Sequence, residues 1–506
     1  MDTKALRQKI LDLAIRGKLV PQDPNDESAS VLIERIRAEK LQMVKDGKLK
    51  PKDIKNDTII FKGDDNLHYE NFSDGSVKCI EDEIPFEVPD NWEWCRFCSY
   101  TLNRDNERKP VSSVQRKKVK KIYDYYGASG VIDQTDSFLF DEKLLLIGED
   151  GANLLARTKP VAFLTDGKYW VNNHAHCIDS IDKKLLNFIC IYINAINLFQ
   201  YVTGSAQPKL NQDNMNRILI PIPPMAEQEK ILERIKIILS NINDIDLLKG
   251  KLQSNIANAK SKILDLAIRG KLVPQDPNDE PASVLLERIR DEKEELIKQG
   301  KIKRDKKESV IFKGDDNSYY QDLPSNWINI RLSAISEIIT KGTTPRGGKI
   351  AYSQSGIGFL RAENIAGYDK LDLLNLNYVD EESHKNYLKR SILKENDILI
   401  TIAGTLGRTA IVPQHTLPLN CNQAVAIVRL VNNKLINVKY LAYTLNSPII
   451  KNDLLAKSVD MAIPNLSLDN IAECNILLPP LLEQKRIVDE IEKIFATLDD
   501  IANQLA

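Results

Sequence analysis

The sequence KILDLAIRGKLVPQDPNDE occupies residues 9–27 of this chain and occurs again, without a single change, at residues 262–280. The similarity continues beyond the identical block, because ASVLIERIRAEK at 29–40 is matched by ASVLLERIRDEK at 282–293. An unbroken repeat of this length is not a coincidence. The chain is therefore a tandem duplication, and the repeat sets its architecture.

The repeated parts enclose two stretches of unlike sequence, residues 85–225 and 322–480. Each begins near a Pro-x-x-Trp motif, as VPDNW and LPSNW, and each ends at a Pro-Pro-x-x-Glu-Gln motif, as PPMAEQ and PPLLEQ. Shared landmarks around different interiors predict two modules of one fold with two different surfaces. A frame that is copied closely while its modules differ is typical of a protein that holds two recognition surfaces.

A long helix is predicted at residues 226–269, directly after the first Glu-Gln motif. Its apolar residues are spaced by four and three positions, which favours a coiled-coil partner over an ordinary core-facing helix, whose 3.6-residue period drifts out of register. Such a helix is about 65 Å long. The last segment of the chain carries the same spacing. The predicted seam consists of Ile231, Ile235, Ile238, Ile242, Ile245, Ile256, Ile263, Leu266, Ile487, Ile491, Ile494, Leu498 and Ile501.

The beginning of the chain continues the pattern that its end interrupts. Its apolar residues match those that close the middle helix, namely Leu6 with Ala259, Ile10 with Ile263 and Leu13 with Leu266. Laid end to end, the last helix and the first therefore reproduce the middle one. We expect the two termini to meet, in a pseudo-twofold, circularly permuted arrangement of two antiparallel helices and two modules.

Composition excludes several classes of protein. Of the 506 residues, 42% are hydrophobic and 28% are charged, which is ordinary for globular domains. The formal net charge of −1 gives no overall attraction to nucleic acid, so such contacts must use local patches. No secretory signal begins the sequence, and the apolar segment 185–202 predicts a buried helix rather than a membrane span. With seven scattered cysteines that fit reduced thiols, we expect a cytoplasmic protein.

Known catalytic motifs are missing from the sequence. It has neither the Asn/Asp-Pro-Pro-aromatic motif of adenine methyltransferases nor a Walker A loop, since GTTPRGGK at 342–349 has glycine where that loop requires lysine. Cys95 and Cys98 form a lone Cys-x-x-Cys in a predicted strand, where they point to opposite faces. His174 and His176 share a strand face, but no further metal ligands stand nearby in sequence. We predict no catalytic residue, metal site or cofactor in this chain.

Candidate nucleic-acid contacts gather in matching parts of the two modules. The first module has a basic cluster, for which a solvated charged loop is the alternative, and the second has a glycine-rich loop. The residues expected to position phosphates are Arg104, Arg108, Lys109, Lys117, Lys118, Lys120 and Lys121, with Thr343, Arg346 and Lys349 in the second module. Those expected to reach base edges are Asn172, Asn173, His174, Gln207 and Lys209, with Arg361, Asn364, Asn422 and Gln423 in the second module.

Several motifs resemble one family. They are LIGEDGANL (146–154), KYWVNNHAH (168–176), GSAQPKLNQ (204–212), KGTTPRGGK (341–349) and GFLRAENI (358–365), together with both copies of LDLAIRGKLVPQDPND. Over essentially its whole length the chain resembles the specificity (S) subunit, HsdS, of type I restriction-modification systems.

The resemblance implies a non-catalytic DNA-binding protein whose two target recognition domains each read one half of a bipartite DNA site. It implies two antiparallel helices that fix the spacer between the halves. The implied partners are double-stranded DNA, two modification (methyltransferase) subunits that hold S-adenosylmethionine, and restriction (translocase/endonuclease) subunits. The long segments 20–83 and 273–321 depart from the simplest layout of the family, and docking of the modification subunits is the role we expect for them.

These inferences predict an α/β, or α+β, multidomain chain. The main alternative is a coiled-coil scaffold whose modules bind proteins, and it predicts no affinity for DNA. The expected segments are an N-terminal conserved helical region at 1–84, target recognition domains at 85–225 and 322–480, a central conserved region with the long helix at 226–321, and a C-terminal conserved helix at 481–506.

Overall fold

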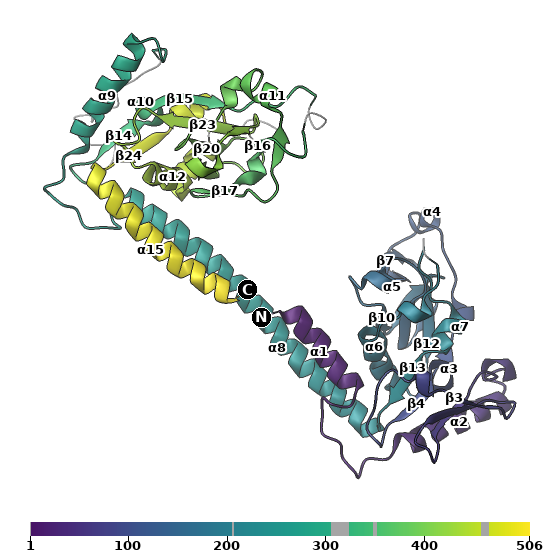
Figure 1. Cartoon of the computed structure of the whole chain (residues 1–506). Helices are drawn as coiled ribbons and strands as arrows, with labels where there is room; N and C mark the ends of the chain where they lie inside the picture. Colours follow the sequence, from purple (N-terminus) through teal and green to yellow (C-terminus); the bar gives the residue numbers. More distant parts are fainter. Residues whose placement is uncertain (1, 205–206, 305–322, 348–351, 457–464, 506) are drawn as a thin grey trace. The chain divides into compact units, whose positions relative to one another are not determined.

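The computed structural model describes residues 2–204, 207–304, 323–347, 352–456 and 465–505 (Figure 1). The chain divides into two compact units, Met1–Leu248 and Lys249–Ala506. Each unit mixes helices with β-sheets, as the α/β prediction requires. In the part of the chain that is described, no helix is both long and apolar enough to cross a lipid bilayer.

The first unit begins with helices and continues into strands. Its elements in chain order are α1 (Thr3–Ile15), α2 (Ala29–Lys45), β1 (Ile59–Lys62), β2 (His68–Asn71), β3 (Val77–Cys79), β4 (Glu93–Arg96), α3 (Phe97–Tyr100), β5 (Leu102–Asn103), α4 (Ser113–Arg116), β6 (Tyr123–Gly127), β7 (Gly130–Thr135), β8 (Phe140–Asp141), β9 (Leu144–Gly148), α5 (Asn153–Ala156), β10 (Ala162–Thr165), β11 (Lys168–Val171), β12 (Ala175–Asp179), α6 (Leu185–Ala195), α7 (Gln212–Asn216) and β13 (Leu219–Ile222).

Helix α8 (Met225–Ile268) runs from the first unit into the second. The elements that follow are α9 (Ala282–Lys298), β14 (Ile328–Arg331), α10 (Leu332–Ile335), β15 (Ser336–Lys341), β16 (Ile357–Leu360), β17 (Ile365–Gly367), β18 (Lys370–Leu371), β19 (Asn377–Val379), α11 (Glu381–Lys385), β20 (Ile398–Thr401), β21 (Thr409–Ile411), β22 (Leu419–Cys421), β23 (Val425–Leu430), α12 (Val438–Asn446), α13 (Pro448–Ala456), α14 (Leu468–Ala472), β24 (Asn475–Leu478) and α15 (Leu481–Leu505).

The module in the first unit has three layers, and strand β9 lies in the middle one. Its sheet has the order β10-β9-β12-β5, and the second sheet has the order β7-β6-β11-β8. Because side chains alternate along a strand, Leu145 and Ile147 join the core that holds α6, whereas Leu144 and Leu146 pack with Phe140 of the other sheet. Burial on both faces explains why LLLIG is an unbroken apolar run.

The module in the second unit repeats these layers. The sheet β15-β23-β20-β21 sends Ile398 and Ile400 into the core that includes α12, and Leu399 into a second core with Leu360 and Cys421 of the sheet β19-β16-β22. In both modules one parallel pair joins the first and the last strand, in chain order, of the outer sheet, β6 with β11 and β16 with β22. The two modules therefore share a fold despite their unlike sequences.

The repeated motifs meet in one contact that occurs in each unit. In the first unit the buried carboxylate of Glu227 accepts hydrogen bonds from Trp92 Nε1 at 2.9 Å and from Gln22 Nε2 at 2.7 Å. In the second unit Glu483 accepts from Trp327 Nε1 at 3.0 Å and from Gln275 Nε2 at 2.6 Å. We call this the Trp–Glu–Gln contact. It joins the Pro-x-x-Trp, Glu-Gln and PQDPND motifs at the base of each module.

Gly17 and Gly270 show why the repeat contains an invariant glycine after its first helix. Both adopt left-handed backbone conformations, with φ of +67° and +66°. A Cβ atom on Gly17 would lie 2.4 Å from Pro89 Cγ, and one on Gly270 would lie 2.6 Å from Pro324 Cγ. Glycine is therefore required both by the backbone and by the proline of the Pro-x-x-Trp motif.

Residues 1–84 are less helical than we expected. Helices α1 and α2 form, but residues 59–79 make the three-stranded sheet β1-β2-β3. The strands IIFK and HYEN are only four residues long and do not alternate strictly between apolar and polar residues, so our helical interpretation overlooked them. Glu70 of β2 is buried and pairs with Arg96 of β4 at 2.6 Å, which fastens this sheet to the module. Residues 311–317, which repeat the sequence IFKGDDN of residues 60–66, lie outside the described residues.

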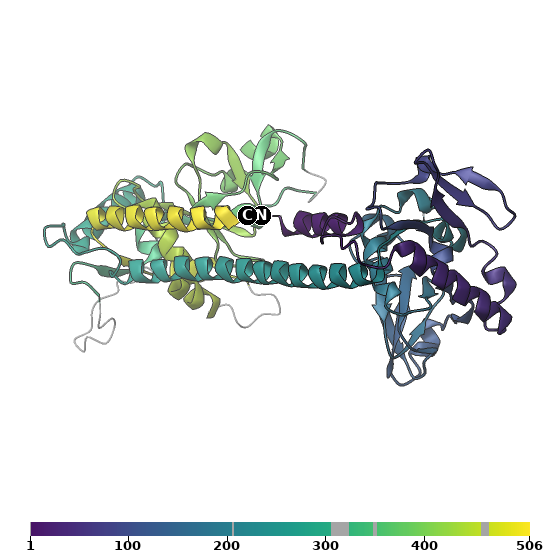
Figure 2. The ribbon, with the colours of Figure 1, turned by 90° about the horizontal axis from the view of Figure 1, so that it is seen from below.

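Within each unit, a terminal helix packs along α8 (Figure 2). In the first unit Arg7 of α1 donates to Asn243 at 2.8 Å, while Ala14 clusters with Ile231 and Ile235, so the two helices are antiparallel. In the second unit Lys260 of α8 pairs with Asp499 of α15 at 2.5 Å. The shared cluster of Leu264, Ala267, Ile487, Val488, Ile491 and Phe495 shows that α15 is antiparallel to α8 as well.

Candidate nucleic-acid interface

Three loops converge at the carboxyl ends of β9 and β11 in the first module. The backbone N–H of Glu149 donates to the carbonyl oxygen of His174 at 2.9 Å, and the N–H of Leu210 donates to the carbonyl of Glu149 at 2.8 Å. These bonds join residues 149–152, 172–174, 203–204 and 207–210, which we call the three-loop junction. The three motifs of the first module that resemble the specificity subunit, far apart in sequence, thus form one surface.

The second module builds the same junction from a different sequence. The N–H of Ile402 donates to the carbonyl of Ala424 at 2.9 Å, and the N–H of Leu466 donates to the carbonyl of Ile402 at 3.0 Å. Ile402, Ala424 and Leu466 thus take the places of Glu149, His174 and Leu210. The backbone pattern is common to both modules, while the side chains that it presents are different.

The central turn of each junction is fixed by an asparagine. The Oδ1 atom of Asn172 accepts from the backbone N–H of His174 at 2.8 Å, and Oδ1 of Asn422 accepts from that of Ala424 at 3.1 Å. Asn172 is buried and Asn422 is half-buried. These two asparagines therefore support the turn rather than project from it. The next residues along the chain, Asn173 and Gln423, are exposed at its tip.

The first arginines of the basic cluster are engaged in ion pairs within the module. Arg104 contacts Glu107 and Glu142 and pairs with Asp179 at 2.8 Å. Arg108, with 13% of its side chain exposed, pairs with Glu149 at 2.7 Å. Arg108 thus holds its segment against the junction, and the attraction that both arginines offer to phosphates is largely neutralised.

The exposed part of the basic cluster lies further along the chain. Lys109, Lys117, Lys118 and Lys120 are exposed, and Lys121 pairs with Asp133 at 2.7 Å. At the junction itself, His174 is about half exposed and pairs with Asp150 at 2.7 Å. Lys209 pairs with Glu149 at 3.1 Å, and Gln207 is exposed.

In the second module the glycine-rich loop lies against the central turn. The N–H of Thr343 donates to the carbonyl of Cys421 at 3.0 Å, and a Cβ atom at Gly342 would lie 2.2 Å from the carbonyl oxygen of Asn422. Arg346 is exposed and stacks 4.9 Å from the centre of the Tyr387 ring. Lys349 lies outside the described residues.

Arg361 and Asn364 follow strand β16 and contact each other. The buried Asn364 accepts from the backbone N–H of Arg361 at 2.9 Å and donates to the carbonyl of Asp372 at 3.0 Å. Arg361 is half-buried and contacts Glu363. Asn364 thus shapes the loop, and Arg361 is the member of this pair that can reach outward.

Comparison with known proteins places these features in one family. A family model described as the type I restriction modification DNA specificity domain matches residues 100–254 and 324–506. The two matches cover more than half of the chain, and each contains most of one module and part or all of the helix that follows it. The chain belongs to this family.

Individual relatives agree with the family match. The chain is 28% identical to the specificity subunit of the type I restriction enzyme EcoEI of Escherichia coli over 580 aligned residues, which cover 99% of this chain and 90% of that protein. It is also 28% identical to the EcoAI specificity subunit of Escherichia coli, with coverage of 98% and 90%. A solved chain from a study of complex assembly and conformational transition of the type I R-M system matches with a TM-score of 0.51 at 15% identity, over 83% of this chain and 94% of that chain. At that identity the likeness concerns the fold alone.

The Cys-x-x-Cys pair and His176 are held within the packing of the first module. Strand β4 ends at Arg96, so Cys95 lies in the strand and Cys98 in the short helix α3, which corrects our expectation of a single strand through both. Burial raises the pKa of the Cys95 thiol far above its usual range. The buried His176 contacts Asp105 at 2.6 Å and the carbonyl of Leu210 at 2.8 Å. Among the residues that are described, no three His, Cys, Asp or Glu side chains gather as a metal site.

The predicted seam residues are buried to different degrees. Six are buried, namely Ile231, Ile235, Ile242, Ile256, Ile487 and Ile491. Six are half-buried, namely Ile238, Ile245, Ile263, Leu266, Ile494 and Leu498, and Ile501 is 39% exposed.

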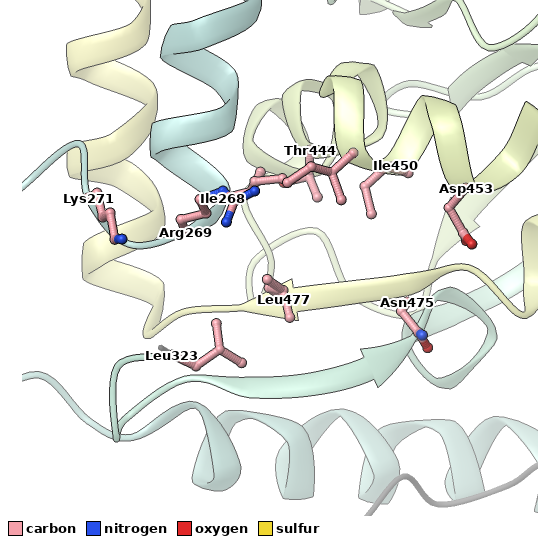
Figure 3. A pocket seen from close by; sticks show the side chains of 10 residues that line it. Ile268, Arg269, Lys271, Leu323, Thr444, Ile450, Asp453, Asn475 and Leu477 are labelled. Atoms are coloured by element: carbon pink, nitrogen blue, oxygen red, sulfur yellow. The ribbon is translucent and has the colours of Figure 1, made fainter. Parts of the chain in front are cut away.

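A cavity of about 430 Å³ lies in the second unit, between the end of α8, helices α12 and α13, and strand β24 (Figure 3). Its lining combines apolar side chains such as Leu323 and Leu477 with Arg269 and Asn475. None of its lining residues belongs to the three-loop junction. The cavity therefore lies where the module packs near the end of helix α8, and it is separate from the candidate interface.

Proposed function

We propose that this chain is the DNA-specificity subunit of a type I restriction-modification complex and that each module reads one half of a bipartite DNA target. The observation that carries the proposal is the three-loop junction, which has the same backbone bonds in both modules but presents Asn173, Gln207 and Lys209 in one and Gln423 in the other. Amide and amino side chains at exposed turns are suited to read base edges in the major groove. Two equivalent turns with different side chains fit two different half-sites.

The proposal also gives helix α8 the role of a ruler that sets the distance between the two half-sites. Helix α8 has 44 residues, which correspond to about 66 Å at 1.5 Å per residue. The antiparallel packing of α1 along one part of α8 and of α15 along another supports a coiled coil formed by α8 with the two terminal helices. In this arrangement the ends of the chain meet and the sequence is a circular permutation of a twofold repeat. The helix length would then set the spacer between the half-sites.

The partners in the proposal are two modification subunits, which would bind S-adenosylmethionine and methylate DNA, and restriction subunits. Two copies of one docking surface suit two copies of one partner. Helices α2 and α9 offer such a repeated surface, because each packs one apolar face on its module while Arg35 and Arg288 stay exposed on the other. We expect the complex to act in the cytoplasm, on the DNA there.

A binding assay tests this proposal against the scaffold alternative. The chain, purified together with its modification subunits, is mixed with duplexes that carry the sequence methylated in a host with the gene and unmethylated in a host without it. We expect binding to this duplex that exceeds binding to a scrambled duplex by about 10³-fold or more at physiological salt. Equal affinity for both duplexes, or none for either, would contradict a specificity subunit.

A further inference from the structure

An exposed pair of apolar side chains stands beside the three-loop junction of the first module. Strand β7 pairs antiparallel with β6, but the register shifts between Tyr125 and Tyr126, so that Asp133 faces Tyr125 and Val131 faces Tyr126. Ile132 is the extra residue of this β-bulge. Val131 and Ile132 are 51% and 54% exposed. A regular strand would direct two consecutive side chains to opposite faces, whereas a bulge re-aims them, so both are left in solvent here.

Gly127 brings this pair to the junction. A Cβ atom at Gly127 would lie 2.9 Å from Ile132 Cδ1 and 3.4 Å from Asn172 Nδ2. The missing side chain therefore leaves a gap through which Ile132 approaches the asparagine that fixes the central turn. Asn173, exposed at the tip of that turn, is the residue next to Asn172. An apolar ridge, Val131 and Ile132, thus lies next to a polar base-reading candidate.

The charged residues around the ridge favour a nucleic acid, rather than an apolar protein surface, as its binding partner. Helix α4 and the segment after it pack against β7 through Asp133, which pairs with Arg116 at 2.7 Å and with Lys121 at 2.7 Å. The same segment carries the exposed Lys117, Lys118 and Lys120. These lysines would contact the phosphates on either side of a DNA groove while Val131 and Ile132 face the bases inside the groove.

We propose that Val131 and Ile132 contact the 5-methyl group of a thymine in the major groove of the half-site read by the first module. This inference rests on the proposed function and specifies one element of the target. Thymine is the base that presents a methyl group in the major groove, and apolar side chains read it by contact. Two β-branched residues side by side on a strand form a shallow ridge that suits contact in the major groove, whereas apolar wedges between base steps are inserted from the minor groove.

The second module differs from the first at the position equivalent to Gly127 and serves as an internal control. The carbonyls of Tyr126 and Leu360 accept equivalent bonds from the N–H groups of Asn172 and Asn422, at 3.1 and 2.9 Å. The residue that follows is Gly127 in the first module but Arg361 in the second. An arginine at this place favours a hydrogen-bonded base such as guanine instead of a methyl contact.

The test uses the complex with its modification subunits and a duplex that carries its methylated site. Each thymine of the site is replaced in turn by 2′-deoxyuridine, which removes only the 5-methyl group. We expect one thymine in one half-site at which this replacement weakens binding about three- to tenfold, the effect of losing one to two buried methyl contacts. The V131A/I132A variant should lose a similar factor on the thymine duplex and nothing further on the deoxyuridine duplex. Because both residues are exposed, the variant should unfold at the same temperature as the original chain.

Val77→Ala is the matched control, since Val77 is 54% exposed on β3, in the small N-terminal sheet. It should bind both duplexes like the original chain. A variant that weakens binding equally on thymine and deoxyuridine duplexes would overturn the methyl contact, as would a site in which no thymine is sensitive or a half-site made only of G·C pairs. Failure of the original complex to prefer its site would instead contradict the proposed function itself.

Discussion

At the scale of single residues, neighbours in sequence have different tasks. Asn172 and Asn173 are consecutive, yet the first is buried and fixes the turn while the second is exposed at its tip. Arg108 and Lys109 differ in the same way, because Arg108 is held by Glu149 and Lys109 is exposed. Residue type alone suggested equal roles for both members of each pair. Their hydrogen-bond partners and exposure divide them into supporting and contacting groups.

Replacement of the exposed tip residues should impair recognition in one half-site at a time. Asn173→Ala and Gln423→Ala each remove an amide that we propose reads a base, so the affinity for the specific duplex should fall by about 1–3 kcal/mol. Affinity for scrambled DNA should stay the same. Fluorescence anisotropy with both duplexes measures this, and Asn56→Ala, at an exposed asparagine outside the two modules, serves as the control. An equal loss on both duplexes would contradict base reading.

The Trp–Glu–Gln contact predicts matched losses of stability in the two units. Trp92→Phe keeps most of the ring but removes the donor to Glu227, and Trp327→Phe does the same to Glu483. A buried carboxylate that loses one partner should cost about 1–3 kcal/mol of unfolding free energy. Denaturant unfolding of the two variants measures this cost. A loss in one variant and none in the other would mean that the two contacts are not equivalent.

The same contact predicts a dependence of stability on pH. Burial raises the pKa of Glu227 and of Glu483 above the ordinary value near 4.5. Between the unfolded and folded pKa values the folded state binds more protons, so the contribution of these carboxyls is present below pH 4.5 and is lost as pH rises through the folded pKa. The Glu227→Gln/Glu483→Gln variant should show a flatter decline of unfolding free energy over that window than the original chain. An unchanged profile would contradict the raised pKa values.

At the scale of elements, the local sequence predicts the long helix but not the short strands. Helix α8 begins at Met225 and ends at Ile268, one residue from each predicted bound, because heptad spacing and the glycine after the helix are local signals. The sheet at residues 59–79 was missed because its strands are only three or four residues long. These short strands are stabilised by contacts with the module, such as the ion pair of Glu70 with Arg96, and the local sequence does not indicate such a contact.

The ruler proposal predicts a change of spacer with helix length. Insertion of four residues into α8, together with extension of α15 by one turn at its C-terminal end, adds about 6 Å. At about 3.4 Å per base pair the preferred spacer should lengthen by one or two base pairs. Sequencing of methylated adenines in a host that carries the insertion variant measures the spacer. An unchanged spacer would contradict the ruler, and a variant with Ala substitutions at exposed α8 positions controls for changes in the helix itself.

At the scale of the whole molecule, the chain is two versions of one unit. Each unit has its own Trp–Glu–Gln contact, its own three-layer module and its own three-loop junction. Duplication explains the repeated frame, and the two copies differ most in the modules. Because the base of each module uses the same motifs, one module can in principle replace another without loss of its seat.

A module exchange tests whether the two surfaces act independently. Residues 85–225 are replaced by the corresponding segment of another member of the family, with the Pro-x-x-Trp and Glu-Gln motifs kept. We expect a methylated site in which one half changes and the other half and the spacer stay the same. The control exchanges residues 322–480, which should change the opposite half. A change in both halves after a single exchange would contradict independent reading.

The sequence by itself determined the duplication, the long helix, the two-module plan and the family, because repeats, heptads and motifs are linear properties of the chain. Only the tertiary structure decided which residues form the candidate interface. The junction depends on backbone hydrogen bonds between segments that lie about 25 to 60 residues apart, such as that from Glu149 to His174 and that from Leu210 to Glu149, and periodicity cannot show such bonds. Exposure was likewise fixed by the packing of the folded chain, which buried Asn172 and Asn364 and left Asn173, Val131 and Ile132 in solvent.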